Sequence, residues 1–322
     1  MFWEGTNMSF FVLSSDPTRH RLKTQVLIPL ILGALLFFPG TAPIVFCEVI
    51  HIGISPQTVP SANINDALAA IKVWTQNSAR AHGIESAFEV AIIDSTTELC
   101  EGLDNQQLEI VSTPTHDMLQ LPPGIKTVFV SVPTGSFPVR YALVAHRDNT
   151  ITTPRDLENS TVVIPRGDFM QLAEIWFDAY VQEYGHPPES SFLTKLTDSE
   201  DVFKAGMQVF FRQIDAAVIP RNALNRMGKR NPQIQNDLFI IGESMPLIPI
   251  VLIVRPSWQT PLRHAMETVL SELHTTPLGK QVLAVFHCSR LEKHPITILE
   301  PTLSFLQNQK KSTQQTGDNE QK

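Results

Sequence analysis

Short polar side chains follow several of the strands that the sequence predicts. Ser55 comes directly after one short apolar strand, and Ser112, Thr113 and Thr115 follow another. The carboxyl ends of parallel strands meet at one edge of a sheet, where helix N-termini offer unpaired N–H groups and a partial positive charge. Hydroxyl groups at such an edge suit an oxyanion, although serine and threonine are also ordinary turn residues and N-caps. The chemistry indicated is noncovalent anion binding.

Two further groups of polar residues stand where a ligand is easily reached. Arg166-Gly167-Asp168 lies between a predicted strand and a predicted helix. Arg166 can clamp a carboxylate or phosphate through two parallel hydrogen bonds, whereas Asp168 can serve simply as the helix N-cap. Arg140 and Tyr141 lie on a strand at a predicted hinge. Each of these residues is a candidate ligand contact, and each can instead have an ordinary structural role.

Motifs for other chemistry are missing from the sequence. It contains no HExxH, GxSxG, GxxxxGK or GxGxxG pattern, and its ten histidines are dispersed, so we predict no metal, no cofactor and no catalytic residues. Cys100 is the best candidate nucleophile if the chain is an enzyme instead. In an oxidising compartment Cys100 and Cys288 either pair or remain two unpaired thiols.

The elements that position these residues alternate between strand and helix. Apolar periodicity predicts helices that begin near Asn65, Phe169, Asp198, Thr260 and Thr276, and strands at His51–Ser55, Phe88–Ile93, Leu108–Val111, Thr127–Val132, Val139–Ala145, Thr161–Ile164, Ser191–Leu196, Ile214–Ile219, Leu238–Ile241 and Pro249–Val254. This order favours an α/β fold with mostly parallel sheets and helices on both faces.

The turn-rich stretch from Pro133 to Pro138 divides the alternation into two modules. We expect lobe 1 to consist of residues 49–138 and 246–307, and lobe 2 to consist of residues 139–245. The C-terminal helices that follow the strand Pro249–Val254 have no strands of their own and would pack on lobe 1. Two crossing segments would then form a hinge, with the ligand cleft between the lobes. The polar composition of residues 308–322 predicts a disordered tail.

The N-terminal segment predicts export. Residues 26–38 carry no charge and follow Arg19, Arg21 and Lys23, which is the pattern of a secretory signal peptide. A retained membrane anchor is the alternative, and either would occupy residues 1–48. We therefore expect an exported protein that is either free or anchored to the membrane.

Composition excludes one class of partner. The 322 residues include 25 Lys plus Arg against 32 Asp plus Glu, a formal net charge of −7, so bulk electrostatics cannot hold this chain on nucleic acid. A net negative charge does not oppose a small anion, because local helix ends and single arginines set such a site.

Three stretches resemble periplasmic solute-binding proteins of ABC transporters, in particular the phosphate/phosphite/phosphonate-binding branch of the type 2 fold. They are VRYALVAHRDNTITTPRDL from Val139, DSEDVFKAGMQVFFRQIDAAVIP from Asp198 and LSELHTTPLGKQVLAVFHCSRL from Leu270. The resemblance implies two lobes, a small anionic ligand, ABC membrane subunits as partners, a monomer and no covalent chemistry. Asp215 matches a recurrent aspartate of the family that either meets a ligand amino group or braces its strand.

One departure and one alternative accompany the resemblance. Phosphonate binders tend to have a loop rich in serine and threonine where this chain has Arg166-Gly167-Asp168, which favours an anion without favouring phosphonate itself. Arg221, just after a predicted strand, is a further possible anion partner or a solvated surface residue. The same cleft would also serve a sensory protein that signals to a membrane partner without transport.

Overall fold

The computed structural model describes residues 49–320 with gaps at 60–63, 82–83, 85, 122, 168, 187–194 and 198–200. The described residues belong to one compact unit, Cys47–Lys322. The predicted signal peptide or anchor at 1–48 lies outside them, as do Asp168 and most of the strand predicted at Ser191–Leu196.

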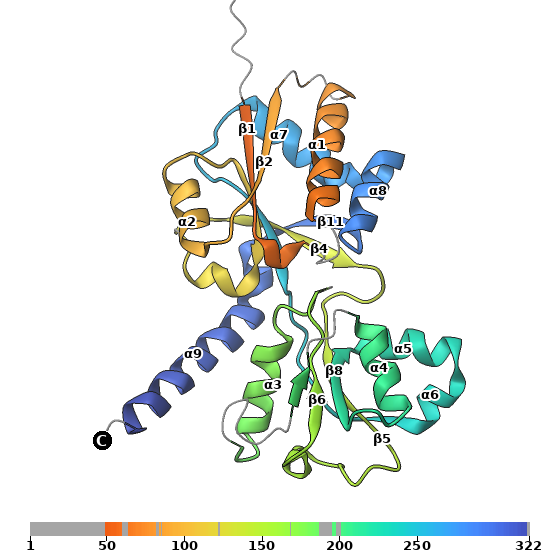
Figure 1. The fold of residues 1–322 in the computed structure, drawn as a ribbon. Coiled ribbons are helices and arrows are strands. Elements are labelled where there is room, and N and C mark those ends of the chain that lie inside the picture. Colours follow the sequence, from red (N-terminus) through yellow and green to blue (C-terminus); the bar gives the residue numbers. More distant parts are fainter. Residues whose placement is uncertain are drawn as a thin grey trace, which may run out of the picture. The chain divides into compact units, whose positions relative to one another are not determined.

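The first sheet has six strands and draws them from both ends of the described chain (Figure 1). In spatial order β11-β4-β10-β3-β1-β2, they are β11 (Cys288–Pro295), β4 (Thr127–Pro133), β10 (Ile250–Val254), β3 (Ile110–Pro114), β1 (Val49–Ile54) and β2 (Ala87–Ile92). β10 lies in the interior of this sheet and is buried at four of its five positions, as its β-branched run predicted. Burying each such side chain contributes about 1.5–3 kcal/mol.

The second sheet has five strands, all from the middle of the chain. In spatial order β7-β6-β8-β5-β9, they are β7 (Lys195–Thr197), β6 (Thr161–Val163), β8 (Ala216–Pro220), β5 (Tyr141–His146) and β9 (Leu238–Glu243). Every residue of β5 and β8 is buried, because these strands lie between neighbours and under helices.

The predicted α/β class is confirmed, but both sheets are mixed and not mostly parallel. β1 pairs in parallel with β2 and β3, and β6 pairs in parallel with β7 and β8. β10 is antiparallel to β3 and β4, β11 to β4, and β5 to β8 and β9. The chain passes from β4 to β5 and returns from β9 to β10. Because β4 leaves the first sheet at the same junction where β10 re-enters it, these two strands run in opposite directions.

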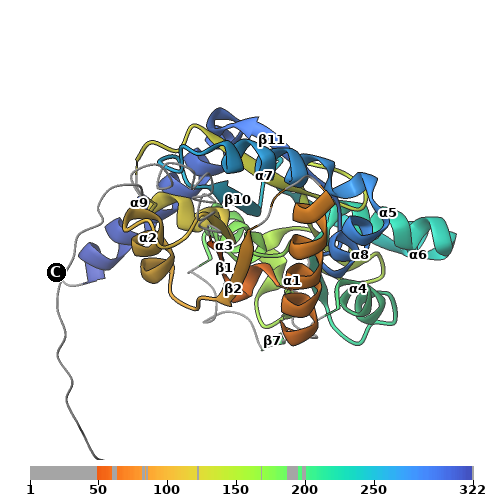
Figure 2. The same ribbon diagram turned by 90° about the horizontal axis from the view of Figure 1, so that it is seen from above.

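Helices from both ends of the described chain cover one face of the first sheet. They are α1 (Ile64–Ala81), α7 (Pro261–Glu272) and α8 (Pro277–Val285), with the short helix η4 (Leu273–Thr275); both views place α1 beside α8 (Figures 1 and 2). α7 and α8 each begin at a proline, and Gly279 N donates to Thr276 Oγ1 over 3.0 Å, as the predicted Thr-Pro starts require. Trp74 of α1 is buried.

The opposite face of the first sheet is covered by α2 (Thr96–Asp104), η2 (Thr115–Leu119) and η5 (Ile296–Leu299). The N-cap of α2 is Ser95, whose hydroxyl accepts from Glu98 N over 3.3 Å. Alternation along β3 explains the two layers: Ile110 and Ser112 face α1 and its neighbours, whereas Val111 packs with leucines of α2.

The helices of the second sheet are α3 (Ala173–Gln182), α4 (Val202–Phe210), α5 (Arg221–Arg230) and α6 (Pro232–Asp237) (Figure 1). Trp176 of α3 is buried. A 3-10 turn, η3 (Pro154–Leu157), begins after its N-cap Thr153, which forms a reciprocal capping box with Asp156 in the turn. The sequence analysis did not predict α5 or α6. α5 is a mostly polar helix that buries few side chains, so it lacks the apolar stripe that indicates a helix.

Two predictions for the C-terminal part are wrong. The segment after α8 does contain a strand, β11, and its alternating charged and half-buried residues conceal it because it is an edge strand open to solvent. Residues 308–320 are helical and not disordered, because α9 (Glu300–Glu320) continues through them. Glutamine and lysine are good helix formers and no proline follows Pro301 of its first turn, so the helix propagates.

Candidate functional site

The carboxyl ends of β1 and β3 bring three hydroxyl groups together. Ser55 follows β1, and its N–H donates to the carbonyl of Ser112 on β3 over 2.9 Å. Ser112 Oγ donates to Thr58 Oγ1 over 3.2 Å, and Thr58 lies in the short helix η1 (Pro56–Thr58). Ser55 and Thr58 are buried and Ser112 is half-buried. The predicted pair Ser55 and Ser112 therefore lies at one edge, and Thr58, which sequence reasoning missed, joins it.

The other two predicted hydroxyls point to the opposite side of β3. Thr113 Oγ1 donates to the buried carboxylate of Asp117 over 2.6 Å, so this hydroxyl already has a structural partner. Thr115 is fully buried, and its hydroxyl has no hydrogen-bond partner among the described residues. Burial lowers the pKa of the neighbouring His116, only partly opposed by Asp117, so its ring is neutral at pH 7.

The second sheet contributes cations at the edge where β8 and β9 end. Arg221 N donates to the carbonyl of Arg140 over 2.7 Å, which holds the two arginines side by side. Both approach one carboxylate, Glu243 at the end of β9, with Nη1–Oε distances of 3.3 Å for Arg221 and 3.7 Å for Arg140. One carboxylate against two guanidinium groups leaves a local excess of one positive charge. An anion can complete this cluster with charge-assisted hydrogen bonds.

The two edges face the same junction of the chain. β4 continues into β5 and β9 into β10, and the two crossing segments pair at Val139 and Leu247. Gln171, just before α3, donates through Nε2 to the carbonyl of Gln57 in η1 over 2.7 Å. Hydroxyl groups from one sheet and guanidinium groups from the other are therefore arranged around segments that connect the sheets.

Three other predicted residues have different surroundings. Tyr141 is fully buried, and its hydroxyl donates to the carbonyl of Phe169 over 2.5 Å; burial also raises its pKa, so it stays a neutral donor. Asp215 lies at the amino end of β8, opposite the arginines, where Oδ2 accepts from Thr161 N over 2.8 Å and braces β6. Arg166 is exposed, and it is followed by Gly167 at φ 97°.

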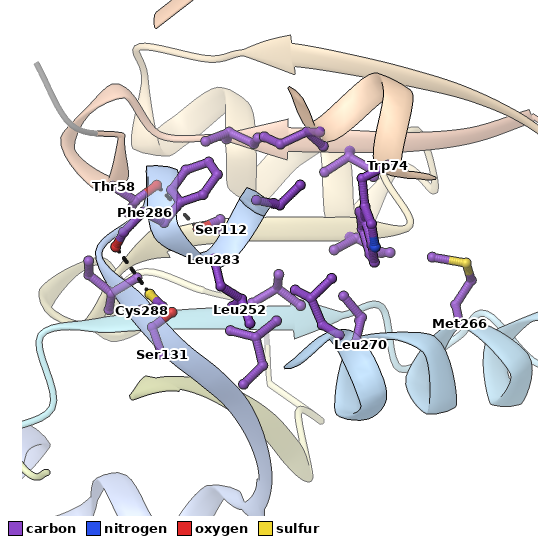
Figure 3. Close-up of a pocket in the computed structure, with 18 residues that line it drawn as sticks. Thr58, Trp74, Ser112, Ser131, Leu252, Met266, Leu270, Leu283, Phe286 and Cys288 are labelled. Atoms are coloured by element: carbon purple, nitrogen blue, oxygen red, sulfur yellow. Dashed lines mark hydrogen bonds between the residues drawn. The ribbon is translucent and has the colours of Figure 1, made fainter. Parts of the chain in front are cut away.

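A cavity of about 90 Å³ lies between the first sheet and the helices α1, α7 and α8 (Figure 3). Its polar side chains, Thr58, Ser112, Ser131 and Cys288, gather at one end, and Trp74, Leu270 and Met266 line the other. Among the described residues that line it, none carries a charge.

Of the described cysteines, Cys288 is buried and Cys100 is half-buried. Burial raises the pKa of the Cys100 thiol, and Asp117, Asp104 and Glu101 raise it further. A raised thiol pKa lowers the fraction of thiolate, the form that attacks substrates. Its surroundings therefore do not activate the residue on which an enzymatic interpretation depends.

The sequence profile of a family described as the phosphonate periplasmic substrate-binding protein of ABC transporters matches residues 59–294. The chain belongs to this family. Its members are transport substrate-binding proteins, which favours transport over the sensory alternative. A comparison with curated protein sequences gave no match.

Solved structures of this family share the two-lobed fold. A binding protein component of an ABC phosphonate transporter from Pseudomonas aeruginosa is 15% identical, covers 82% of this chain and 87% of its own, and has a TM-score of 0.54. PhnD1 from Prochlorococcus marinus, solved with methylphosphonate, is 12% identical, covers 81% of this chain and 98% of its own, and has the same TM-score. A Xanthomonas citri protein, solved with ATP, is 12% identical, covers 82% of this chain and 98% of its own, and has a TM-score of 0.54. At these identities the likeness establishes the type 2 fold and no ligand.

The family is periplasmic. Within the residues that the structure describes, no helix has both the length and the apolar character to cross a bilayer.

Proposed function

We propose that this protein captures a phosphonate- or phosphate-like anion at the junction of its two sheets and delivers it to the membrane subunits of an ABC importer. The observation that carries the proposal is the pairing of Arg140 and Arg221 against the single carboxylate of Glu243. This cluster lies at the end of the second sheet where the chain crosses to the first sheet, and Ser112 lies at the end of β3 next to the returning strand β10. The family to which the chain belongs supports the same ligand class.

The chemistry of the two edges complements a tetrahedral anion. Guanidinium groups donate to two oxygens at once, and hydroxyl groups donate to a third without adding charge.

The proposed organisation follows the two sheets. Lobe 1 comprises residues 49–138 and 246–307, and lobe 2 comprises residues 139–245, which hold the second sheet. Ligand binding would close the lobes about the two crossing segments. Residues 1–48 would export the chain as a signal peptide or retain it as an anchor, and the exported protein would act as a monomer.

A thermal-shift panel tests the ligand class. Phosphate, methylphosphonate, sulfate, methanesulfonate and acetate are each added at rising concentration to the protein after unfolding and refolding to remove carried ligand. A ligand at 100 times its dissociation constant stabilises the folded state by about 2.7 kcal/mol. We expect phosphonate or phosphate to raise the melting temperature well above acetate. Equal melting temperatures across the whole panel would refute the proposal.

A further inference from the structure

The cavity of the first sheet has the character of a binding pocket for an uncharged, apolar group. Its wall is almost entirely aliphatic or aromatic, and the described residues that form it include no Asp, Glu, Lys, Arg or His. A single water needs roughly 10–15 Å³ of comparable space and two to four polar partners. The volume of about 90 Å³ exceeds this several-fold, but its apolar part offers no such partners.

The packing around the cavity indicates space that the core leaves open. Leu252 lies on β10, in the interior of the sheet, beneath the layer formed by α7 and α8, yet it is only half-buried. Ser112, its register partner on β3, is half-buried as well. Protein interiors are normally close-packed. Open space under a helix layer is therefore unusual and is typical of a binding pocket.

The polar end of the cavity coincides with the proposed anion site. Ser112 and Thr58 are joined by a hydrogen bond of 3.2 Å and belong to both (Figure 3). Trp74 and Leu270 line the opposite end, which leads away from the sheet edge. A molecule with an anionic head at the edge and an apolar tail would match both parts at once.

We propose that this cavity receives the organic substituent of the ligand, so that the preferred substrates are phosphonates or phosphate monoesters with a short unbranched alkyl chain. The inference rests on the proposed function and adds the substrate class. Substituents that carry an ammonium or carboxylate group are disfavoured, because the cavity has no charge to pair with them and burying an unpaired ion is costly.

A titration of the wild-type protein with methyl-, propyl- and butylphosphonate, followed by 2-aminoethylphosphonate, tests the inference by calorimetry. Each added methylene that enters the cavity should tighten binding about fourfold until the space is full. The amino compound should bind more weakly than propylphosphonate, which has nearly the same length.

A variant that fills the cavity gives an independent test. Ser131→Met places an apolar side chain in the cavity wall, and Ser304→Met on the exposed surface of α9 is the matched control. Ser131→Met should reduce the ratio of butylphosphonate affinity to methylphosphonate affinity toward one. Ser304→Met should leave this ratio as it is in the wild-type protein.

The outcomes separate the two proposals. If methylphosphonate binds and the longer chains gain nothing in the wild-type protein, the cavity does not take the substituent, while the proposed function stands. If no phosphonate or phosphate binds at all, the proposed function fails, and the inference fails with it.

Discussion

The strongest stability prediction concerns an ion pair buried at the end of the first sheet opposite the proposed anion site. Arg255 Nη2 donates to Glu109 Oε1 over 2.7 Å, and the two side chains are only 7% and 6% exposed. The second carboxylate oxygen accepts from His51 N over 2.8 Å. Arg255→Met removes the cation and leaves a buried carboxylate without its charge partner. We expect a loss of about 3–5 kcal/mol in the free energy of unfolding.

Urea denaturation, followed by far-UV circular dichroism, measures this change against a matched control. Arg212 pairs with Asp148 on the surface, with both side chains 62% exposed, so Arg212→Met should cost at most about 1 kcal/mol. The double variant Glu109→Met with Arg255→Met should be less destabilised than Arg255→Met alone, because no uncompensated charge remains. It should still retain a deficit of about 1–3 kcal/mol, since the His51 N–H loses its acceptor. Equal losses for Arg255→Met and Arg212→Met would refute the reasoning.

Three further predictions follow from individual contacts. Thr113→Val removes a 2.6 Å hydrogen bond to the buried carboxylate of Asp117 and should cost about 1.5–3 kcal/mol in urea denaturation, more than Thr96→Val, whose bond to the same carboxylate is 3.0 Å; the reverse order would contradict the geometry. Cys100 should react with iodoacetamide more slowly at pH 7 than a free cysteine and accelerate only at higher pH, because its pKa is raised; peptide mass spectrometry that finds fast alkylation at pH 7 would count against this. Hydrogen bonds from the backbone and side chains of Thr152 and Thr153 lower the pKa of Asp156 to about 2. The stabilisation of η3 by this cap is therefore complete above the ordinary aspartate pKa and is lost as the pH falls toward 2. A carbon-13 NMR titration of the Asp156 carboxyl with a midpoint near pH 4 would disprove this.

Local signals predicted most elements of the fold. The run PIVLIV predicted the buried strand β10, because β-branched apolar residues favour a strand packed on both faces. Proline after threonine predicted the starts of α7 and α8. β11 escaped detection because an edge strand needs no apolar alternation, and α9 because polar composition also suits a solvated helix.

The sequence predicted only those residues of the candidate site whose position follows from the end of a strand. Ser55 and Ser112 lie together because parallel neighbours end at one edge, which the order of elements indicates. The position of Arg221 just after a strand made it a possible partner, but its pairing with Arg140 and Glu243 depends on the antiparallel register of β5, β8 and β9. Nothing in the sequence specifies that register.

The account's central claim is anion capture by the two arginines, and one titration tests it most directly. Methylphosphonate is titrated calorimetrically into the wild-type protein, the double variant Arg140→Met with Arg221→Met, and Arg212→Met at the opposite edge of the second sheet. Each lost charge-assisted hydrogen bond is worth about 1.5–3 kcal/mol, roughly ten- to 150-fold in affinity. We predict saturable one-to-one binding to the wild type and the control, and a loss of at least about 100-fold in the double variant. Wild-type affinity in the double variant would contradict the account.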